Sequence, residues 1–230
     1  MSETEVAIVL LSAKVALAAV SFALVPAFAV AWLLARREFV GRGFLQAIVT
    51  LPLVLPPVVT GYGLLVLFGT HGPLGSFFET VFDLTFAFRW TGAALAAGVM
   101  AFPLLVRPIR LSLESVDKGL EEAAATLGAR RIIVFFTVTL PLVMPGLIAG
   151  AVLAFAKALG EFGATITFVS NIPGETQTLS LAIYALLQSP TGDAAALRLI
   201  IAAIVLALAA VLASEWLGHR LSGGGKNGRA

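Results

Sequence analysis

Long runs without a charged residue constrain the fold of this chain more than any other feature. About 20 apolar residues in a helix are needed to cross the hydrocarbon core of a bilayer. Five runs approach or exceed this length, with Lys14 as their only charged residue: residues 6–35, 44–70, 90–106, 132–156 and 199–214. Only 12% of the 230 residues are charged, against about 25% in a soluble domain. The sequence therefore predicts an all-α integral membrane protein with five transmembrane helices in one domain over residues 1–220, and a flexible tail over 221–230.

Lysine and arginine are distributed unequally between the two sides of this predicted bundle. Eleven of them fall in the segments 36–43, 107–131 and 220–229, whereas Arg89 is alone in the segments of the opposite side. Loops rich in these residues stay in the cytoplasm. We therefore expect the N-terminus outside and the C-terminus inside. Residues 178–188 are apolar but too few to span a bilayer, so we expect a re-entrant or surface helix on the outer face.

The cytoplasmic loop contains a short helix whose two ends are marked in the sequence. Asp117 can accept hydrogen bonds from the first backbone N–H groups, and Gly128 can adopt the left-handed conformation that ends a helix. Glu121 and Glu122 stand near the N-terminus, where the helix dipole favours negative charge. These signals predict a helix over Lys118–Leu127.

One face of this helix is apolar. Leu120, Ala123, Ala124 and Leu127 share that face because residues three and four apart are neighbours on a helix, and Glu122 points nearly the opposite way. An isolated helix of this length is marginal in water, so something must pack on it. The apolar face either packs on the chain's own bundle or docks on a cytoplasmic protein.

The same segment resembles the cytoplasmic signature of bacterial ABC importer permeases. That signature is Glu-Ala-Ala, three residues, Gly, nine residues, and Ile-x-Leu-Pro. This chain has Glu122-Ala123-Ala124, Gly128 and Leu140-Pro141 at the same spacing, with Val138 in place of the Ile. The resemblance implies a type I ABC importer permease fold. It also implies a coupling loop over 112–141, whose helix fits a groove on an ATPase subunit and transmits its motion to the membrane helices.

Further segments resemble the permeases of molybdate transporters, and the likeness covers most of residues 44–217. These segments are LPLVLPPVVTGYGLL (51–65), AFPLLVRPIRLSLESVD (101–117) and the run that contains GEFGATITFVSNIPGETQT (160–178). The resemblance implies a permease that carries molybdate across the bacterial inner membrane, with a periplasmic N-terminus and a cytoplasmic C-terminus. Tungstate and sulfate remain alternative substrates.

The resemblance also implies the partners of this chain. They are a second copy of itself, two cytoplasmic ABC ATPase subunits, a periplasmic oxyanion-binding protein and the lipid membrane, without nucleic acid. The sequence has no Gly-x-x-x-x-Gly-Lys-Ser/Thr loop to cradle phosphates, so ATP and Mg are expected on the partner ATPase and no cofactor on this chain. An ion-gradient-driven secondary carrier is an alternative, although five spans cannot divide into two equal inverted repeats. The chain has no paired groups for catalysis within the predicted spans, which disfavours an enzyme.

Several residues inside the predicted spans are candidates for the transport pathway. Lys157 and Glu161, four residues apart, either form an ion pair that limits the cost of charge in the membrane or contact the anion. Pro52, Pro56 and Pro57 predict a kink in the second span that serves as a gate, lines a cavity or only fits the packing. Lys14 in the first span and Arg198 at the start of the last are expected to extend their charged ends to the outer interface. Close helix contacts are expected at four glycines: Gly61, Gly63, Gly92 and Gly98.

Overall fold

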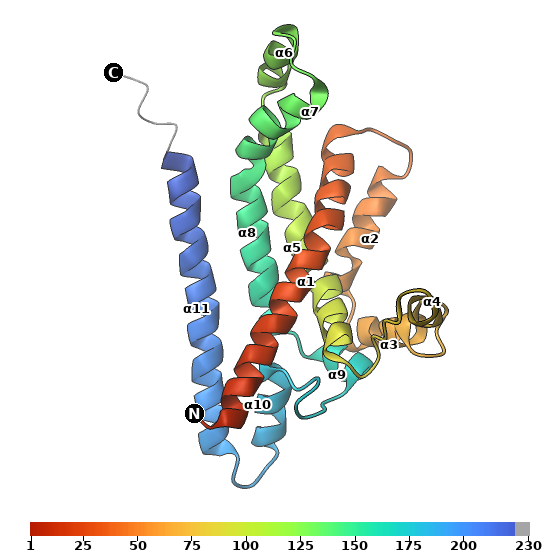
Figure 1. Cartoon of the computed structure of the whole chain (residues 1–230), viewed down its shortest axis with the longest axis vertical. Helices are drawn as coiled ribbons and strands as arrows, with labels where there is room; N and C mark the ends of the chain where they lie inside the picture. Colours follow the sequence, from red (N-terminus) through yellow and green to blue (C-terminus); the bar gives the residue numbers. More distant parts are fainter. Residues whose placement is uncertain (224–230) are drawn as a thin grey trace.

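The computed structural model describes the backbone of residues 1–223, and the side chains up to Ala213 together with that of Trp216 (Figure 1). Within this part of the chain every regular element is a helix. In chain order they are α1 (Glu3–Arg36), α2 (Arg42–Val54), α3 (Pro57–Phe68), α4 (Pro73–Phe82), α5 (Trp90–Ser115), α6 (Lys118–Thr126), α7 (Arg131–Val134), the π-helix η1 (Phe135–Thr139), α8 (Leu140–Leu159), α9 (Gly163–Val169), α10 (Leu179–Leu187) and α11 (Asp193–Gly223). α11 ends inside the segment 221–230 that we predicted as a flexible tail, and the rest of that segment lies outside the described residues.

Four helices are long and apolar enough to span a membrane. They are α1, α5, the continuous segment Arg131–Leu159, and the Asp193–Ala213 part of α11. The remaining predicted span, residues 44–70, consists of α2 and α3, which are bent by 112° relative to each other. The structure therefore has four helices of spanning length, or up to five membrane segments if α2 and α3 together form one span. The second predicted span is a broken pair of helices rather than one kinked helix.

Two adjacent prolines account for this break. Leu55 has extended backbone angles (φ −69°, ψ 145°), which the ring of a following proline favours. Pro56 and Pro57 have no backbone N–H, so the hydrogen-bond ladder of α2 cannot continue through them. Pro57 is instead the first residue of α3, where a missing N–H costs nothing. The chain consequently leaves α2 in a new direction.

α5 forms the centre of the bundle, between α1 and α8 (Figure 1). In the most apolar 18-residue stretch of α5, 67% of the residues are buried, compared with 22% in α1 and 11% in α11. Small residues allow the backbones to approach closely: a Cβ atom on Gly98 would lie 3.3 Å from the carbonyl oxygen of Ala19. Gly61 and Gly92 also sit against neighbouring backbone as expected, whereas the prediction for Gly63 is wrong because it faces open space.

α10 lies at the end of the molecule opposite α6, beside the starts of α1 and α11 (Figure 1). The predicted helix over residues 178–188 is present as α10. Its first backbone N–H, on Leu179, donates to the Ser12 hydroxyl of α1 at 2.7 Å. Arg198, near the start of α11, has a partner that the sequence did not indicate: its guanidinium donates to the Glu5 carboxylate through bonds of 2.6 and 3.0 Å.

Candidate functional site

α6 stands at one extremity of the molecule, beyond the ends of α5 and α8 (Figure 1). Asp117 caps it, because its Oδ1 accepts from the backbone N–H of Gly119 at 2.8 Å. Its C-terminus is a Schellman motif: Gly128 N–H donates to Ala125 O, Ala129 N–H donates to Ala124 O, and Gly128 has φ +87°. The predicted helix Lys118–Leu127 is therefore confirmed to within one residue, with Leu127 as the C-cap.

The apolar face of α6 does not pack on the chain's own bundle. No residue of α6 is buried. Leu120 is 51% exposed and Leu127 is 89% exposed, and of the two alanines between them Ala123 is exposed and Ala124 half-buried. A nine-residue helix whose flanking and internal leucines are in water has to be held by other contacts.

Those contacts come from Glu121, the neighbour of the glutamate in the signature. One oxygen of the Glu121 carboxylate, Oε1, accepts from Arg36 Nη2 at 2.7 Å and from Thr139 Oγ1 at 2.6 Å. Arg36 ends α1 and Thr139 ends η1, so three elements meet at one carboxylate. We call the three side chains of Arg36, Glu121 and Thr139 the Glu121 junction.

Sequence reasoning missed this junction. The sequence predicts the acidic residues at the start of α6 as partners of the helix dipole, and the signature contains Glu122, which is exposed, rather than Glu121. Arg36 lies 85 residues from Glu121 along the chain. The only sequence signal is that Glu121 stands off the apolar face and is about 100° from Glu122 around the helix.

The Leu-Pro pair of the signature lies where the coupling loop joins the membrane segment. Leu140 is the first residue of α8, and its N–H bonds to Phe135 O across the wide turn of η1. Pro141 follows in the first turn of α8, and a proline clashes with the carbonyl four residues earlier in a regular helix. The wide π-turn directly before Pro141 relieves that clash. Such turns are rare and are found mostly at functional sites.

Aromatic side chains pack around the Glu121 junction. The Arg36 guanidinium lies 5.5 Å from the Trp32 ring. Trp32 meets Phe135, the first residue of η1, edge to face at 5.5 Å, and Phe28 meets the same ring at 5.9 Å. The end of α1 is thereby joined to η1 by ring contacts as well as through Glu121.

Lys157 and Glu161, the charged pathway candidates, form an ion pair of 2.6 Å near the end of α8. Glu161 is 2% exposed and Lys157 32% exposed. Glu161 also accepts from the backbone N–H of Ala164 at 3.0 Å, at the start of α9. The break at Pro57 is nearby, because a Cβ atom on Gly163 would lie 2.7 Å from the Cβ of Pro57. The structure thus brings three of the pathway candidates into one region, while Pro56 and Pro57 themselves are exposed.

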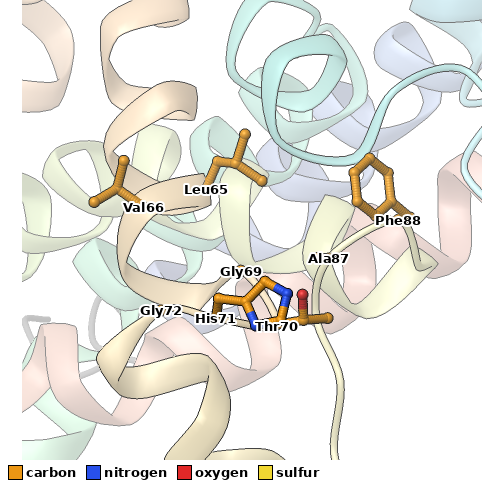
Figure 2. A pocket seen from close by; sticks show the side chains of 8 residues that line it. All are labelled: Leu65, Val66, Gly69, Thr70, His71, Gly72, Ala87 and Phe88. Carbon is orange, nitrogen blue, oxygen red and sulfur yellow. The ribbon is translucent and has the colours of Figure 1, made fainter.

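A separate pocket of about 270 Å³ lies between the end of α3 and the loop before α5 (Figure 2). His71, Thr70 and Phe88 are among its lining residues, and none of the lining residues is lysine or arginine. The pocket therefore offers no fixed positive charge to an oxyanion. Within the described residues no group of three His, Cys, Asp or Glu side chains could hold a metal ion.

Comparisons with known proteins agree on the class of protein. The chain is 57% identical over 217 residues to the molybdenum transport system permease protein ModB of Escherichia coli, covering 94% of this chain and 95% of that protein. It is 53% identical to the ModB protein of Haemophilus influenzae with the same coverage. A sulfate transport system permease protein of Salmonella typhimurium is 38% identical over 84% of this chain and 70% of its own length.

Two solved structures share the fold. A bacterial ABC transporter that imports the acidic polysaccharide alginate matches with a TM-score of 0.73 at 18% identity, over 96% of this chain and 80% of that chain. The inward-facing MetNI methionine ABC transporter matches with a TM-score of 0.71 at 17% identity, over 96% of this chain and 99% of that chain. The fold is that of type I ABC importer permeases. The family model of the binding-protein-dependent transport system inner membrane component matches residues 27–223, and the chain therefore belongs to this family of permease subunits, whose ATPase is a separate subunit.

Proposed function

We propose that this chain is the membrane-spanning permease subunit of an ATP-driven importer that carries molybdate across the bacterial inner membrane. The observation that carries the proposal is the 57% identity to a molybdenum permease over 94% of the chain. The sulfate permease is more distant at 38%. Sulfate and tungstate are therefore the alternative substrates, and discrimination among the three belongs to the binding protein that delivers them.

The exposed face of α6 supports docking on an ATPase subunit. Leu120 and Leu127 are left in water by their own chain, and burial of a leucine contributes roughly 1.5–3 kcal/mol. The alanines between them allow another backbone to approach closely. A partner that supplies a groove for this face would gain most of that energy.

The arrangement of charge supports the proposed orientation. Arg36, Arg42 and Arg131 stand at the ends of α1, α2 and α7 on the side of α6, and basic residues concentrate on the cytoplasmic side of membrane proteins. The N-terminus and α10 then face the periplasm, where an oxyanion-binding protein delivers its cargo. The C-terminus is cytoplasmic.

The proposed assembly is two copies of this chain with two ATPase subunits. A pathway on a twofold axis is the economical arrangement, because five membrane segments in one chain leave little room for a polar channel. ATP and Mg bind to the ATPase partner. Closure of the ATPase pair moves the two α6 helices together, and the membrane segments alternate between outward and inward openings. Lys157, Glu161, Pro56 and Pro57 stay candidates for the pathway. Lys157 is the member of its ion pair with exposed surface.

The function is tested in liposomes that contain this chain, its ATPase and its binding protein. Molybdate should stimulate ATP hydrolysis and uptake at lower concentrations than tungstate or sulfate. An ion gradient without ATP should drive no uptake. Uptake on the gradient alone would establish the secondary-carrier alternative, and stimulation by sulfate in preference to molybdate would reassign the substrate.

The docking assignment is tested by Ala124→Trp, which places a bulky ring in the apolar face of α6. Uptake should be abolished while the protein still inserts into the membrane. Thr126→Trp is the matched control, because Thr126 is exposed on the same helix but off the apolar face. Equal uptake by the Ala124→Trp protein and the wild type would contradict the assignment.

A further inference from the structure

The backbone at both ends of α6 is suited to a hinge. Val116 and Asp117 are extended (ψ 124° and 119°) between α5 and α6, and Gly128 is left-handed at the other end. The continuous hydrogen-bond ladder that makes a helix stiff is interrupted at each of these joints. The covalent connections alone therefore do not fix how α6 is oriented on the membrane segments.

We infer that Glu121 is a positioning residue that, through Arg36 and Thr139, couples movement of α6 to α1 and to η1; the inference rests on the proposed function of α6 as the ATPase-docking helix. Both hydrogen bonds end on the same carboxylate oxygen. Their donors come from two other elements: Arg36 of α1 is 85 residues from Glu121 and Thr139 of η1 is 18 residues from it.

Burial makes this junction stronger than an ordinary surface ion pair. The side chains of Arg36 and Glu121 are 13% and 22% exposed, and Thr139 is buried. Ion pairs that are exposed to water contribute little, whereas removing one partner of a buried pair leaves an uncompensated charge. Hydrogen bonds to an ionised carboxylate are also stronger than neutral ones.

The contacts form a closed circuit through three elements. Glu121 of α6 binds Arg36 of α1 and Thr139 of η1, and Trp32 of α1 packs on Phe135 of η1. A force that tilts α6 is therefore transmitted to the end of α1 and to the start of α8 at the same time. The π-turn is the part of this circuit whose backbone can change its hydrogen-bond register, since it lies between two α-helical segments.

The two adjacent glutamates then have different tasks. Glu122 points away from the bundle and is exposed, so it is available to the docking partner. Glu121 is half-buried and binds Arg36 and Thr139 of the bundle. Substituting Glu122 should therefore affect docking of the ATPase, and substituting Glu121 should affect how movement of α6 reaches the membrane segments.

The first test measures molybdate transported per ATP hydrolysed by the complete complex in liposomes. With Glu121→Gln, the ATPase should still bind, because the exposed face of α6 is unchanged, but transport per ATP should fall by about tenfold or more. The exchanged pair Glu121→Arg with Arg36→Glu should recover part of the loss, since the Thr139 hydroxyl can accept as well as donate. Unchanged transport per ATP in Glu121→Gln, or no recovery in the exchanged pair, would overturn the inference. A wild-type complex that does not import at all would instead refute the proposed function.

The second test does not depend on transport. The sequence contains no cysteine, so a single Thr126→Cys protein can carry a spin label on the exposed side of α6. Glu121→Gln and Arg36→Met should each increase the mobility of that label, and the double variant should increase it no further. A label whose mobility is the same in all four proteins would show that the junction does not hold α6, whatever the substrate.

Discussion

Replacing Leu127 by alanine should weaken binding of the ATPase without weakening the fold of the permease. Leu127 is 89% exposed in the isolated chain, so its removal loses almost no contact within the protein, and such surface changes stay within about 0.5 kcal/mol of the wild-type free energy of unfolding. Alanine is also compatible with its backbone angles (φ −76°, ψ 5°) at the C-cap. The effect should therefore appear only in the complex.

The size of the effect follows from the carbon atoms removed. Leucine to alanine deletes three carbons, and each buried CH₂ contributes about 0.8 kcal/mol. Full burial of Leu127 in the partner's groove thus contributes about 2.4 kcal/mol for each α6, which is about 50-fold in the dissociation constant. Partial burial gives a proportionally smaller change.

The assay is a titration of the purified ATPase subunit onto detergent-solubilised permease, with thermal unfolding of the permease alone as the second readout. Leu212→Ala is the matched control, because Leu212 is 66% exposed but lies on α11, far from α6. The control should bind the ATPase like the wild type. If Leu127→Ala does so too, Leu127 is not in the interface and the docking face has been assigned to the wrong side of α6.

Three further substitutions test local features. Gly128→Ala should raise the conformational free energy of the end of α6 by about 1–2 kcal/mol, because alanine disfavours the left-handed backbone. In the same titration, ATPase binding should weaken by about 5- to 30-fold. Unchanged binding would mean that the end of the helix adopts another conformation without loss. Gly61→Ala should destabilise the bundle by about 1–3 kcal/mol, since its Cβ would lie 2.5 Å from a carbonyl oxygen of α9. Gly63→Ala should not, because no atom beyond the neighbouring backbone of its own helix lies within 4 Å of the added Cβ. Equal unfolding temperatures for the two variants would refute this packing. Lys157→Met leaves the buried Glu161 carboxylate without its cation and should lower the free energy of unfolding, by less than the roughly 3–5 kcal/mol of a fully buried pair because Lys157 is 32% exposed. Lys157→Arg keeps the charge and should unfold near the wild-type temperature; equal unfolding of the Met and Arg variants would refute the role of the pair.

The parts of the fold that depend on local chemistry could be predicted from the sequence. Asp117 and Gly128 marked the ends of α6 because a cap and a left-handed glycine act within one turn of the helix. The uncharged runs located the membrane segments because burial in lipid requires about 20 apolar residues regardless of how they pack. The apolar run 178–188 was long enough for a helix and too short for a span, and α10 is that helix.

Features of the fold that depend on the relative orientation of helices, or on contacts between residues far apart in the sequence, could not be predicted. Pro56 and Pro57 predicted a kink in the second span, whereas the break of 112° between α2 and α3 depends on the packing of α3 against α9 and α4. The π-turn before Pro141 left no distinct sequence pattern. The choice of Glu121 rather than Glu122 as the inward carboxylate depends on Arg36, which only the folded chain brings near.

If α6 docks on an ATPase as proposed, it has to face the cytoplasm. The most direct measurement is labelling of a single Leu127→Cys protein, in a chain without other cysteines, by a membrane-impermeant maleimide. The account predicts no labelling in intact cells, labelling in inside-out vesicles stripped of the ATPase, and protection when the ATPase is added back. Labelling in intact cells, or equal labelling of inside-out vesicles with and without the ATPase, would contradict it.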